Sequence, residues 1–392
     1  MRIAESAREM LEHRIIPFWA NLRDEENGGF YGLLDYDLNL HRDAVKGCIL
    51  NSRILWFFSE AAMATGSELA RDCAGHARRF MAERCMDREN GGLFWSVTFD
   101  GRPSDTTKHT YNQAFGIYAL ASWYRLSGEE QALRDAFDLF EIIEKRCRDE
   151  GGYLEAFTRD WQPAENDKLS ENNVIAQRTM NTLLHVFEGY SGLYRATADP
   201  RVGKALRDML DIYAEKVYDP EKRRQRVFFD MDYNELIDLH SYGHDIESSW
   251  LIDWGTSLLG DAALSKRIAD IDSRLAEHIY ERAYRDHSLL NECERGVDNT
   301  WRIWWVQAEA VLGFVNALEK TGDAKYGAAA ADIYRYIQEK LTDPRPGSEW
   351  FWELDAQGRP SSRKPIVEPW KCPYHNGRMC MELMRHDPDI EI

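Results

Sequence analysis

The chain has 392 residues and a mass of 45.6 kDa; 44% of the residues are apolar and 30% are charged, so it can bury a sizeable core. Its net charge of −18 and pI near 5.1 repel phosphate backbones, so no nucleic-acid partner is expected. No apolar run approaches the roughly 18 residues of a membrane span, and no basic segment with an apolar stretch behind it opens the chain. We therefore expect no membrane partner.

The seven cysteines are odd in number and scattered, without a C-x-x-C pair. Disulfide frameworks and structural zinc sites use cysteines in even numbers or at close spacing. This pattern predicts reduced thiols in a cytoplasmic protein.

Turns recur along the chain with a period of about sixty residues. The first three are glycine pairs that follow acidic or asparagine residues, and the next three are weaker breaks. They lie at Gly28-Gly29, Gly91-Gly92, Gly151-Gly152, Asp219-Pro220, Asp286 and Pro346-Gly347. A fixed period of this length is typical of repeat architectures, so we expect six units.

Each unit has a helical stretch before its turn and a more apolar helix after it. In the fifth unit the apolar residues from Leu264 to Ile279 recur every three or four positions, which indicates one helix face. The stretch from Trp304 to Leu318 is apolar over a broader surface, as in a buried helix.

Six buried helices can stack as an open solenoid or close as an inner ring. The chain has no linker and no shift of composition, which favours the ring. The sequence therefore predicts an all-α fold, a single (α/α)6 barrel domain over residues 1–392 with six inner and six outer helices. Aromatic loop stretches at residues 93–97 and 349–353 predict short β-hairpins.

Residues suited to chemistry gather where the inner helices are expected to begin. These helix starts lie at one end of such a barrel, and successive units place the residues 58 to 74 positions apart. Residues distant in sequence are therefore expected to surround one central cleft. They are Arg53, Tyr111, Asn181, His185, His244, Glu247, Trp304, Trp305, Trp370 and His375.

Two of the histidines have a polar neighbour on the same helix face. Asn181 lies four residues before His185, although a histidine on an apolar helix can also be a core residue. Glu247 lies three residues after His244 and is expected to orient the imidazole, unless it only complements the helix dipole. A zinc site from His240, His244 and Glu247 is a weaker alternative, because a glycine is expected to break the helix between the histidines.

The third histidine, His375, follows Pro373, which suits the first turn of a helix. The chain shows no nucleophile elbow, phosphate loop or clear metal motif. Three histidines at helix starts therefore indicate acid/base chemistry near neutral pH, without a cofactor or a metal.

Arg53 and the tryptophans have two interpretations each. Arg53 follows Asn51-Ser52, an expected helix cap, and precedes an apolar run. It is either an ion-paired structural residue or a cation directed into the cleft. The tryptophans Trp304, Trp305 and Trp370 are either core residues or platforms for a sugar ring.

These segments resemble the N-acylglucosamine 2-epimerase superfamily and, within it, the cellobiose 2-epimerases. The matching stretches are Lys108–Phe115, Asn181–His185, Ser241–Trp250, Trp304–Glu309 and Trp370–His375. The resemblance implies an (α/α)6 barrel. It also implies reversible epimerisation at C2 of the reducing-end glucose of cellobiose, cello-oligosaccharides or lactose, through ring opening and a cis-enediol.

The resemblance implies roles for individual residues as well. His244 and His375 match an acid/base pair, His185 a third essential histidine, and Arg53 the arginine of a family motif. The positions that match residues around the sugar are Tyr111, Asn181, Glu247, Trp304, Trp305, Glu309 and Trp370. The expected partner is a small disaccharide substrate, handled by a monomer.

Other functions on this fold stay open. An aldose–ketose isomerase shares the enediol, and a monosaccharide or N-acylglucosamine 2-epimerase differs in substrate. An inverting glycoside hydrolase needs two carboxylates about 6.5–9.5 Å apart, for which Glu247, Glu309 and Glu368 are available. Neither a hydrolase nor a non-catalytic carbohydrate-binding protein explains three histidines at helix starts.

Overall fold

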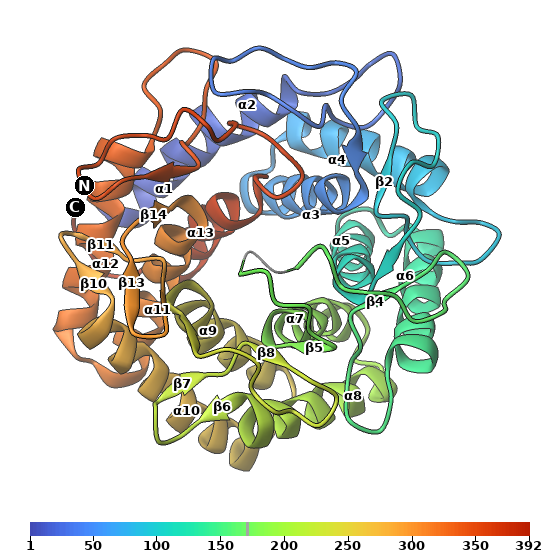
Figure 1. Ribbon diagram of the computed structural model, residues 1–392. Helices are drawn as coiled ribbons and strands as arrows, with labels where there is room; N and C mark the ends of the chain where they lie inside the picture. Colours follow the sequence, from blue (N-terminus) through green and yellow to red (C-terminus); the bar gives the residue numbers. More distant parts are fainter. Residues whose placement is uncertain (170–171) are drawn as a thin grey trace.

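In the computed structural model, which describes residues 1–169 and 172–392, the chain forms two concentric rings of helices (Figure 1). The inner ring consists of α3 (Cys48–Thr65), α5 (Thr110–Ser127), α7 (Met180–Thr197), α9 (Tyr242–Leu258), α11 (Trp304–Thr321) and α13 (Tyr374–His386). These helices are buried on most of their surface, and all are largely apolar except α13, which buries His375, Asn376 and Arg378. The predicted (α/α)6 barrel is confirmed.

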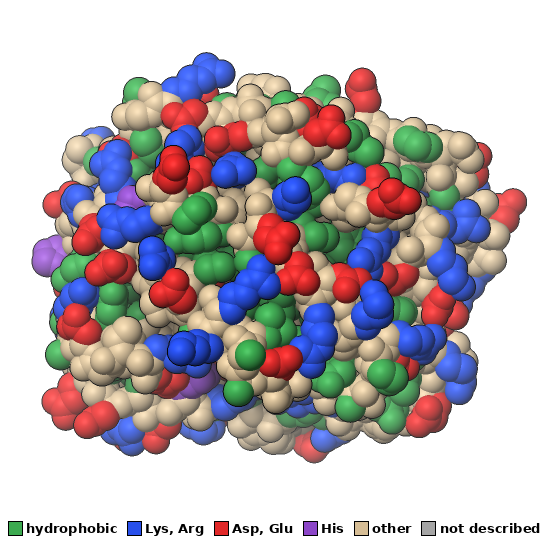
Figure 2. Space-filling view, turned by 90° about the horizontal axis from the view of Figure 1, so that it is seen from below, with side chains coloured by type: hydrophobic (Ala, Val, Ile, Leu, Met, Phe, Trp, Pro, Cys, Tyr) green, Lys and Arg blue, Asp and Glu red, His purple; other side chains and the backbone are tan. Residues whose placement is uncertain are grey.

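The outer ring is amphipathic and alternates with the inner ring along the chain. It consists of the continuous helix α1 (Ile3–Met10) to α2 (Ile16–Ala20), followed by α4 (Glu68–Phe80), α6 (Glu130–Ile142), α8 (Pro200–Ile212), α10 (Ala262–Arg282) and α12 (Ala324–Tyr336). Four of these helices end in a π-helical turn, at Met81–Cys85, Ile143–Cys147, Tyr213–Val217 and Ile337–Leu341. The outer side of the barrel interleaves acidic and basic side chains (Figure 2).

The two ends of the chain close the ring. The N–H of Ile3 donates to the carbonyl of Ile390 (2.9 Å), and the N–H of Ile392 donates to the carbonyl of Met1 (3.1 Å). The termini therefore lie side by side, with α13 against α1 (Figure 1).

Short antiparallel strands join neighbouring repeats at the end where the inner helices begin. The pairs are β1 (Lys46–Gly47) with β2 (Ser96–Val97), β3 (Lys108–His109) with β4 (Ala156–Phe157), β5 (Arg178–Thr179) with β8 (Phe228–Phe229), and β14 (Arg302–Ile303) with β15 (Glu353–Leu354). The fourth repeat has a three-stranded sheet, β9 (Leu239–Ser241), β12 (Glu292–Glu294) and β13 (Val297–Asn299).

Hairpins are formed by β6 (Tyr218–Asp219) with β7 (Arg224–Gln225), by β10 (Tyr284–Arg285) with β11 (Ser288–Leu289), and by β12 with β13. The aromatic stretches at 93–97 and 349–353 each lead into a tight hairpin, closed by the bridges Val97–Pro103 and Leu354–Pro360, as the sequence predicted. Their strands pair with the segment before the preceding inner helix, as in Lys46 with Val97 and Ile303 with Glu353.

Buried ion pairs hold the glycine-rich turns against the helices that follow them. Lys46 and Lys108, two residues before α3 and α5, donate to Asp24 (2.6 Å) and Asp87 (3.1 Å). Both lysines and both aspartates are at most 1% exposed, so each charge depends on its partner. The corresponding pairs elsewhere are Lys371 with Glu349, which is fully buried, and Arg178 with Asp149 and Arg302 with Asp286, whose aspartates are 33% and 86% exposed. The ion pair therefore recurs from repeat to repeat together with the turn.

The expected cap at Asn51-Ser52 is wrong. The helix α3 begins earlier, at Cys48, with Gly47 as its N-cap. Asn51 lies in the first turn and receives a hydrogen bond from the backbone N–H of Phe30 (3.1 Å), so it holds the preceding turn. Gln113 and Gln307 bind the turn residues Leu93 and Leu289 from the same position of their helices.

All seven cysteines are free and buried, as their irregular spacing predicted. Among the described residues, no helix has the length and apolar character needed to cross a membrane.

Candidate active site

A cavity opens at the end of the barrel where the inner helices begin. It encloses about 1190 Å³ of space, counting its open mouth. Every inner helix contributes to its wall. The predicted site residues on the wall are Arg53, Tyr111, Asn181, His185, His244, Glu247, Trp304, Trp305, Trp370 and His375.

The three histidines on the wall are each held through Nδ1. His185 Nδ1 lies 2.8 Å from Glu188, and His375 Nδ1 lies 2.7 Å from Glu309. His244 Nδ1 lies 2.7 Å from the hydroxyl of Ser241. Because each ring is tied down on the same side, Nε2 is the nitrogen left for a substrate.

Burial keeps these imidazoles neutral. It lowers the pKa of His244 to about 3, and it lowers the pKa values of His185 and His375 as well. The Arg378 guanidinium lowers the pKa of His375 further. Neutral imidazoles can accept a proton near neutral pH, which is what a general base requires.

The expected bond between Glu247 and His244 is absent among the described contacts. Glu247 instead accepts from Arg378 Nη2 (2.6 Å), and its nearest histidine is His375, at 4.0 Å from Nδ1. The reason is tertiary: Arg378 on α13 lies between the carboxylates of α9 and α11, whereas His244 is turned to the start of its own helix.

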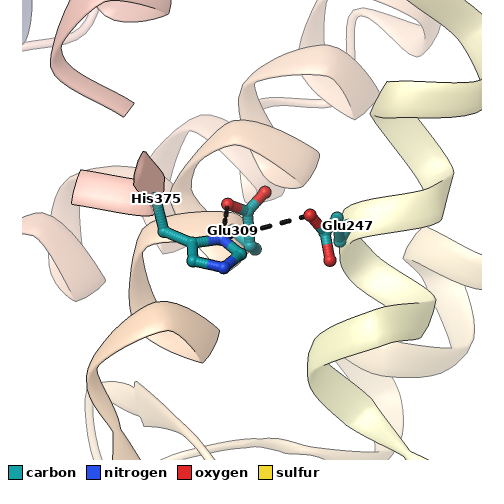
Figure 3. Close-up of side chains that lie close together, drawn as sticks. All are labelled: Glu247, Glu309 and His375. Carbon is teal, nitrogen blue, oxygen red and sulfur yellow. Dashed lines mark hydrogen bonds and ion pairs between the residues drawn. The ribbon is translucent and has the colours of Figure 1, made fainter. Parts of the chain in front are cut away.

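Glu309 does not lie around the sugar cavity as the family pattern suggested. It is fully buried behind His375, and it accepts from His375 Nδ1, from Arg378 Nη2 (2.8 Å) and from the indole N–H of Trp250 (3.0 Å). Figure 3 shows that Glu309 and Glu247 both face the same ring nitrogen of His375. Glu309 therefore touches the histidine that would do the chemistry, not the cavity.

A buried network that sequence analysis missed connects two of the histidines. Arg378 donates to Glu188, Glu247 and Glu309, and Tyr374 donates to Glu188. Although burial alone would raise it, the Arg378 guanidinium holds the pKa of Glu188 below its usual value. One cation thus serves the carboxylates behind both His185 and His375. The sequence contained one signal for this network: a charged residue lies three positions after each of the two histidines, Glu188 after His185 and Arg378 after His375.

Arg53 is directed at the cavity and has no carboxylate within 4.0 Å in the described part of the chain. Its Nη2 donates to the Tyr111 hydroxyl (2.6 Å), and its guanidinium lies 4.1 Å from the ring centre of Phe115 and 5.0 Å from that of Tyr374. Its Nε is buried without a hydrogen-bond partner. This environment favours the second interpretation of Arg53, a cation available to a ligand.

The tryptophans differ in exposure. Trp304 is 1% exposed and packs edge-on against His375, whereas Trp305 and Trp370 are half-buried. The Trp305 ring lies 4.8 Å from His244 and 5.4 Å from His375 between ring centres. Trp305 and Trp370 therefore offer the ring surface that a sugar platform needs.

The zinc alternative does not fit the structure. His240 Nε2 is bound to Asp245 (2.8 Å), so it is already occupied. Glu247, Glu309 and His375 have ligand atoms within 4.8 Å of one another. However, Arg378 donates to both carboxylates and supplies the positive charge that a metal ion would bring.

The chain is similar to known proteins over most of its length. The family model described as N-acylglucosamine 2-epimerase (GlcNAc 2-epimerase) matches residues 28–376. A cellobiose 2-epimerase of Eubacterium cellulosolvens is 49% identical over 402 aligned residues, which cover 98% of this chain and 99% of that protein.

Two solved structures are similar over almost the whole chain. The crystal structure of a sugar epimerase from a ruminal bacterium is 47% identical with a TM-score of 0.98, covering 99% of this chain and 100% of that one. The structure of cellobiose 2-epimerase from Bacillus thermoamylovorans is 43% identical with a TM-score of 0.94, covering 98% and 99%. This chain therefore belongs to the N-acylglucosamine 2-epimerase family.

Proposed function

We propose that this chain is an epimerase that inverts C2 of the reducing-end glucose of cellobiose, cello-oligosaccharides and lactose, so that the glucose unit becomes mannose. The observation that carries the proposal is the set of three imidazoles on one cavity wall, each fixed through Nδ1, beside the uncompensated Arg53 guanidinium. The cellobiose 2-epimerases among its relatives support the choice of substrate.

The C2 proton of glucose becomes acidic only after the pyranose ring has opened to the aldehyde. A base then removes this proton and leaves a cis-enediolate, and return of a proton to the opposite face of C2 gives the epimer. The two bases in this proposal are His244 on α9 and His375 on α13, whose rings both pack against Trp305. Bases on two different helices can serve two faces of a sugar bound between them.

The enediolate needs a positive charge or hydrogen-bond donors near its oxygen atoms. Arg53 supplies a buried guanidinium whose Nε has no hydrogen-bond partner in the described residues. His185 is close to this guanidinium, because the ring of Tyr111, to which Arg53 donates, lies 5.0 Å from the His185 ring. In this proposal Arg53 and His185 stabilise the oxyanion. Asn181, whose Oδ1 is buried without a partner in the described residues, and Glu247 hold the sugar hydroxyls.

A glycoside hydrolase fits the site poorly. Both Glu247 and Glu309 accept from the same nitrogen of Arg378, and their nearest oxygens are within 4.8 Å, closer than the roughly 6.5–9.5 Å of inverting enzymes. Glu309 also lies behind His375, out of reach of a glycosidic bond.

The lining residues come from all six inner helices of one chain, which supports a monomeric enzyme formed by a single domain. Sedimentation velocity tests the monomer: a protein of one chain's mass, 45.6 kDa, that is fully active agrees with it, and activity confined to a larger species contradicts it.

The test of the function is to incubate the protein with cellobiose and separate the products. Glucosyl-mannose is the expected product. A ketose would indicate an aldose–ketose isomerase, free glucose a hydrolase, and no change a binding protein. Parallel incubations with lactose, glucose and N-acetylglucosamine separate a disaccharide epimerase from a monosaccharide one.

A further inference from the structure

The residue at the start of α9 makes an unusual hydrogen bond. Ser241 is the N-cap of this helix, yet its hydroxyl binds no backbone N–H of the first turn. Its Oγ instead lies 2.7 Å from Nδ1 of His244, on the same turn. Ser241 is 7% exposed and lies on the cavity wall next to the imidazole it contacts.

Other hydroxyl residues at helix starts in this chain behave differently. Ser67 accepts from the N–H of Ala70 (3.2 Å) at the start of α4, and Thr179 accepts from the N–H of Thr182 (3.0 Å) at the start of α7. Such caps stabilise the helix because they satisfy an otherwise unpaired N–H group. At α9 the hydroxyl is directed to the side chain of His244 instead, which points to a role in the site.

The partner of His244 also differs in kind from the partners of the other two histidines. Glu188 and Glu309 are carboxylates, which stabilise a protonated imidazole. A hydroxyl is uncharged and can either donate or accept. It therefore holds the ring in both protonation states without favouring the charged one.

The surroundings of His244 make an uncharged partner suitable. Burial is the largest cause of the lowered pKa of His244; His185 from α7 lowers this pKa further, and Glu309 from α11 raises it. Glu247 from α9, His375 from α13 and Glu292 from β12 line the same cavity. A carboxylate at position 241 would add another negative charge to this wall and would make His244 a stronger base.

We propose that Ser241 is a positioning residue for His244: its hydroxyl fixes the imidazole through Nδ1, keeps Nε2 toward the cavity and, because it is uncharged, leaves His244 less basic than a carboxylate partner would. The kinetic part of this proposal rests on the proposed function.

The test compares Ser241→Ala, Ser241→Thr and Ser241→Asp with the wild type in kcat, KM and the pH dependence of cellobiose epimerisation. Ser241→Ala is expected to lower kcat about tenfold to a hundredfold, a part of the usual acid/base contribution, with KM changed less than about threefold. Ser241→Thr keeps the hydroxyl and is expected to regain most of kcat. Ser241→Asp is expected to move the acid limb of the pH profile to higher pH, because a carboxylate stabilises the imidazolium.

Ser67→Ala is the matched control, since it removes a serine from another N-cap. It is expected to lower thermal stability while kcat and the pH profile stay as in the wild type. Ser241→Ala is expected to show the reverse, because no backbone cap is lost there. Wild-type kcat in Ser241→Ala, or a higher KM at unchanged kcat, would overturn the positioning role.

A second measurement does not depend on activity. Nitrogen-15 NMR of the His244 ring reports which nitrogen carries the proton and at what pH the ring titrates. A change of tautomer or titration in Ser241→Ala and Ser241→Asp supports the proposal even where the wild type fails to epimerise cellobiose, in which case only the proposed function falls. Ring signals identical to the wild type in both variants would refute the role of Ser241.

Discussion

Replacing Glu309 by glutamine is expected to slow the reaction without weakening substrate binding. The change keeps the size of the side chain and removes its charge. Glu309 touches His375, Arg378 and Trp250, and it lies outside the cavity. We therefore expect KM to stay within about threefold of the wild type while kcat falls about tenfold to a hundredfold, or about 1.4–2.7 kcal/mol of transition-state stabilisation.

The cost in stability can be worked out from the same contacts. An amide cannot accept from all three donors as the carboxylate does, so one charge-assisted hydrogen bond is lost, at about 1.5–3 kcal/mol. Arg378 keeps Glu188 and Glu247 as partners. With an unfolding entropy of about 2.1 cal/mol/K per residue, a chain of 392 residues is expected to lose about 2–4 °C in Tm and to stay folded in the assay.

Glu349→Gln is the matched control for this experiment. Glu349 is also fully buried and accepts from the indole N–H of Trp19 (3.0 Å), from the side-chain amide of Asn376 and from a cation, Lys371 (2.6 Å), but it contacts no histidine among the described residues. It is expected to lose similar stability at unchanged kcat. The assay is steady-state epimerisation of cellobiose across pH, in which Glu309→Gln is also expected to shift the acid limb to lower pH, because the lost carboxylate favoured the imidazolium of His375.

The reasoning is refuted if Glu309→Gln raises KM more than tenfold at normal kcat, since Glu309 would then contact the sugar. It is equally refuted if both glutamine variants lose kcat to the same extent.

Four further predictions follow from the site and the fold. His244→Asn and His375→Asn are each expected to lower kcat about 10²–10⁴-fold; full activity of both variants would contradict their assignment as acid and base. Epimerisation by the wild type in D₂O is expected to place deuterium at C2 of the product. Trp370→Ala is expected to impair turnover of cellobiose more than that of mannose, because only the disaccharide has a second ring; equal losses would make Trp370 a packing residue. Dialysis against EDTA is expected to leave activity intact, and a loss restored by one divalent ion would contradict a metal-free mechanism. Finally, burial would raise the pKa of the Asp87 carboxyl, but its bonds to Arg159 and Lys108 hold this pKa far below the unfolded value of about 3.9. The ionised Asp87 therefore stabilises the fold above that pH, and this contribution to the free energy of unfolding is lost as the pH falls below it. Lys108→Met is expected to reduce the pH dependence of the free energy of unfolding below about pH 4, and an unchanged profile would count against a stabilising role of the Lys108–Asp87 pair.

The architecture and the position of the site could be predicted from the residue pattern alone. A period of about sixty residues and mostly apolar inner helices are local properties, and in a chain without a linker or a shift of composition they favour a closed ring over an open solenoid. Since every turn opens onto an inner helix, residues as far apart as Arg53 and His375 were expected at one end of the ring, and both line the cavity.

The pairing of the buried side chains became visible only in the folded chain. Glu247 seemed to belong to His244, three residues away, but it binds Arg378, 131 residues further along the chain. Glu309 resembled a sugar contact, yet it lies behind His375. Sequence spacing fixes neighbours on one helix, whereas a buried charge takes its partner from whichever helix packs opposite, because it must be paired wherever the fold brings a partner within reach.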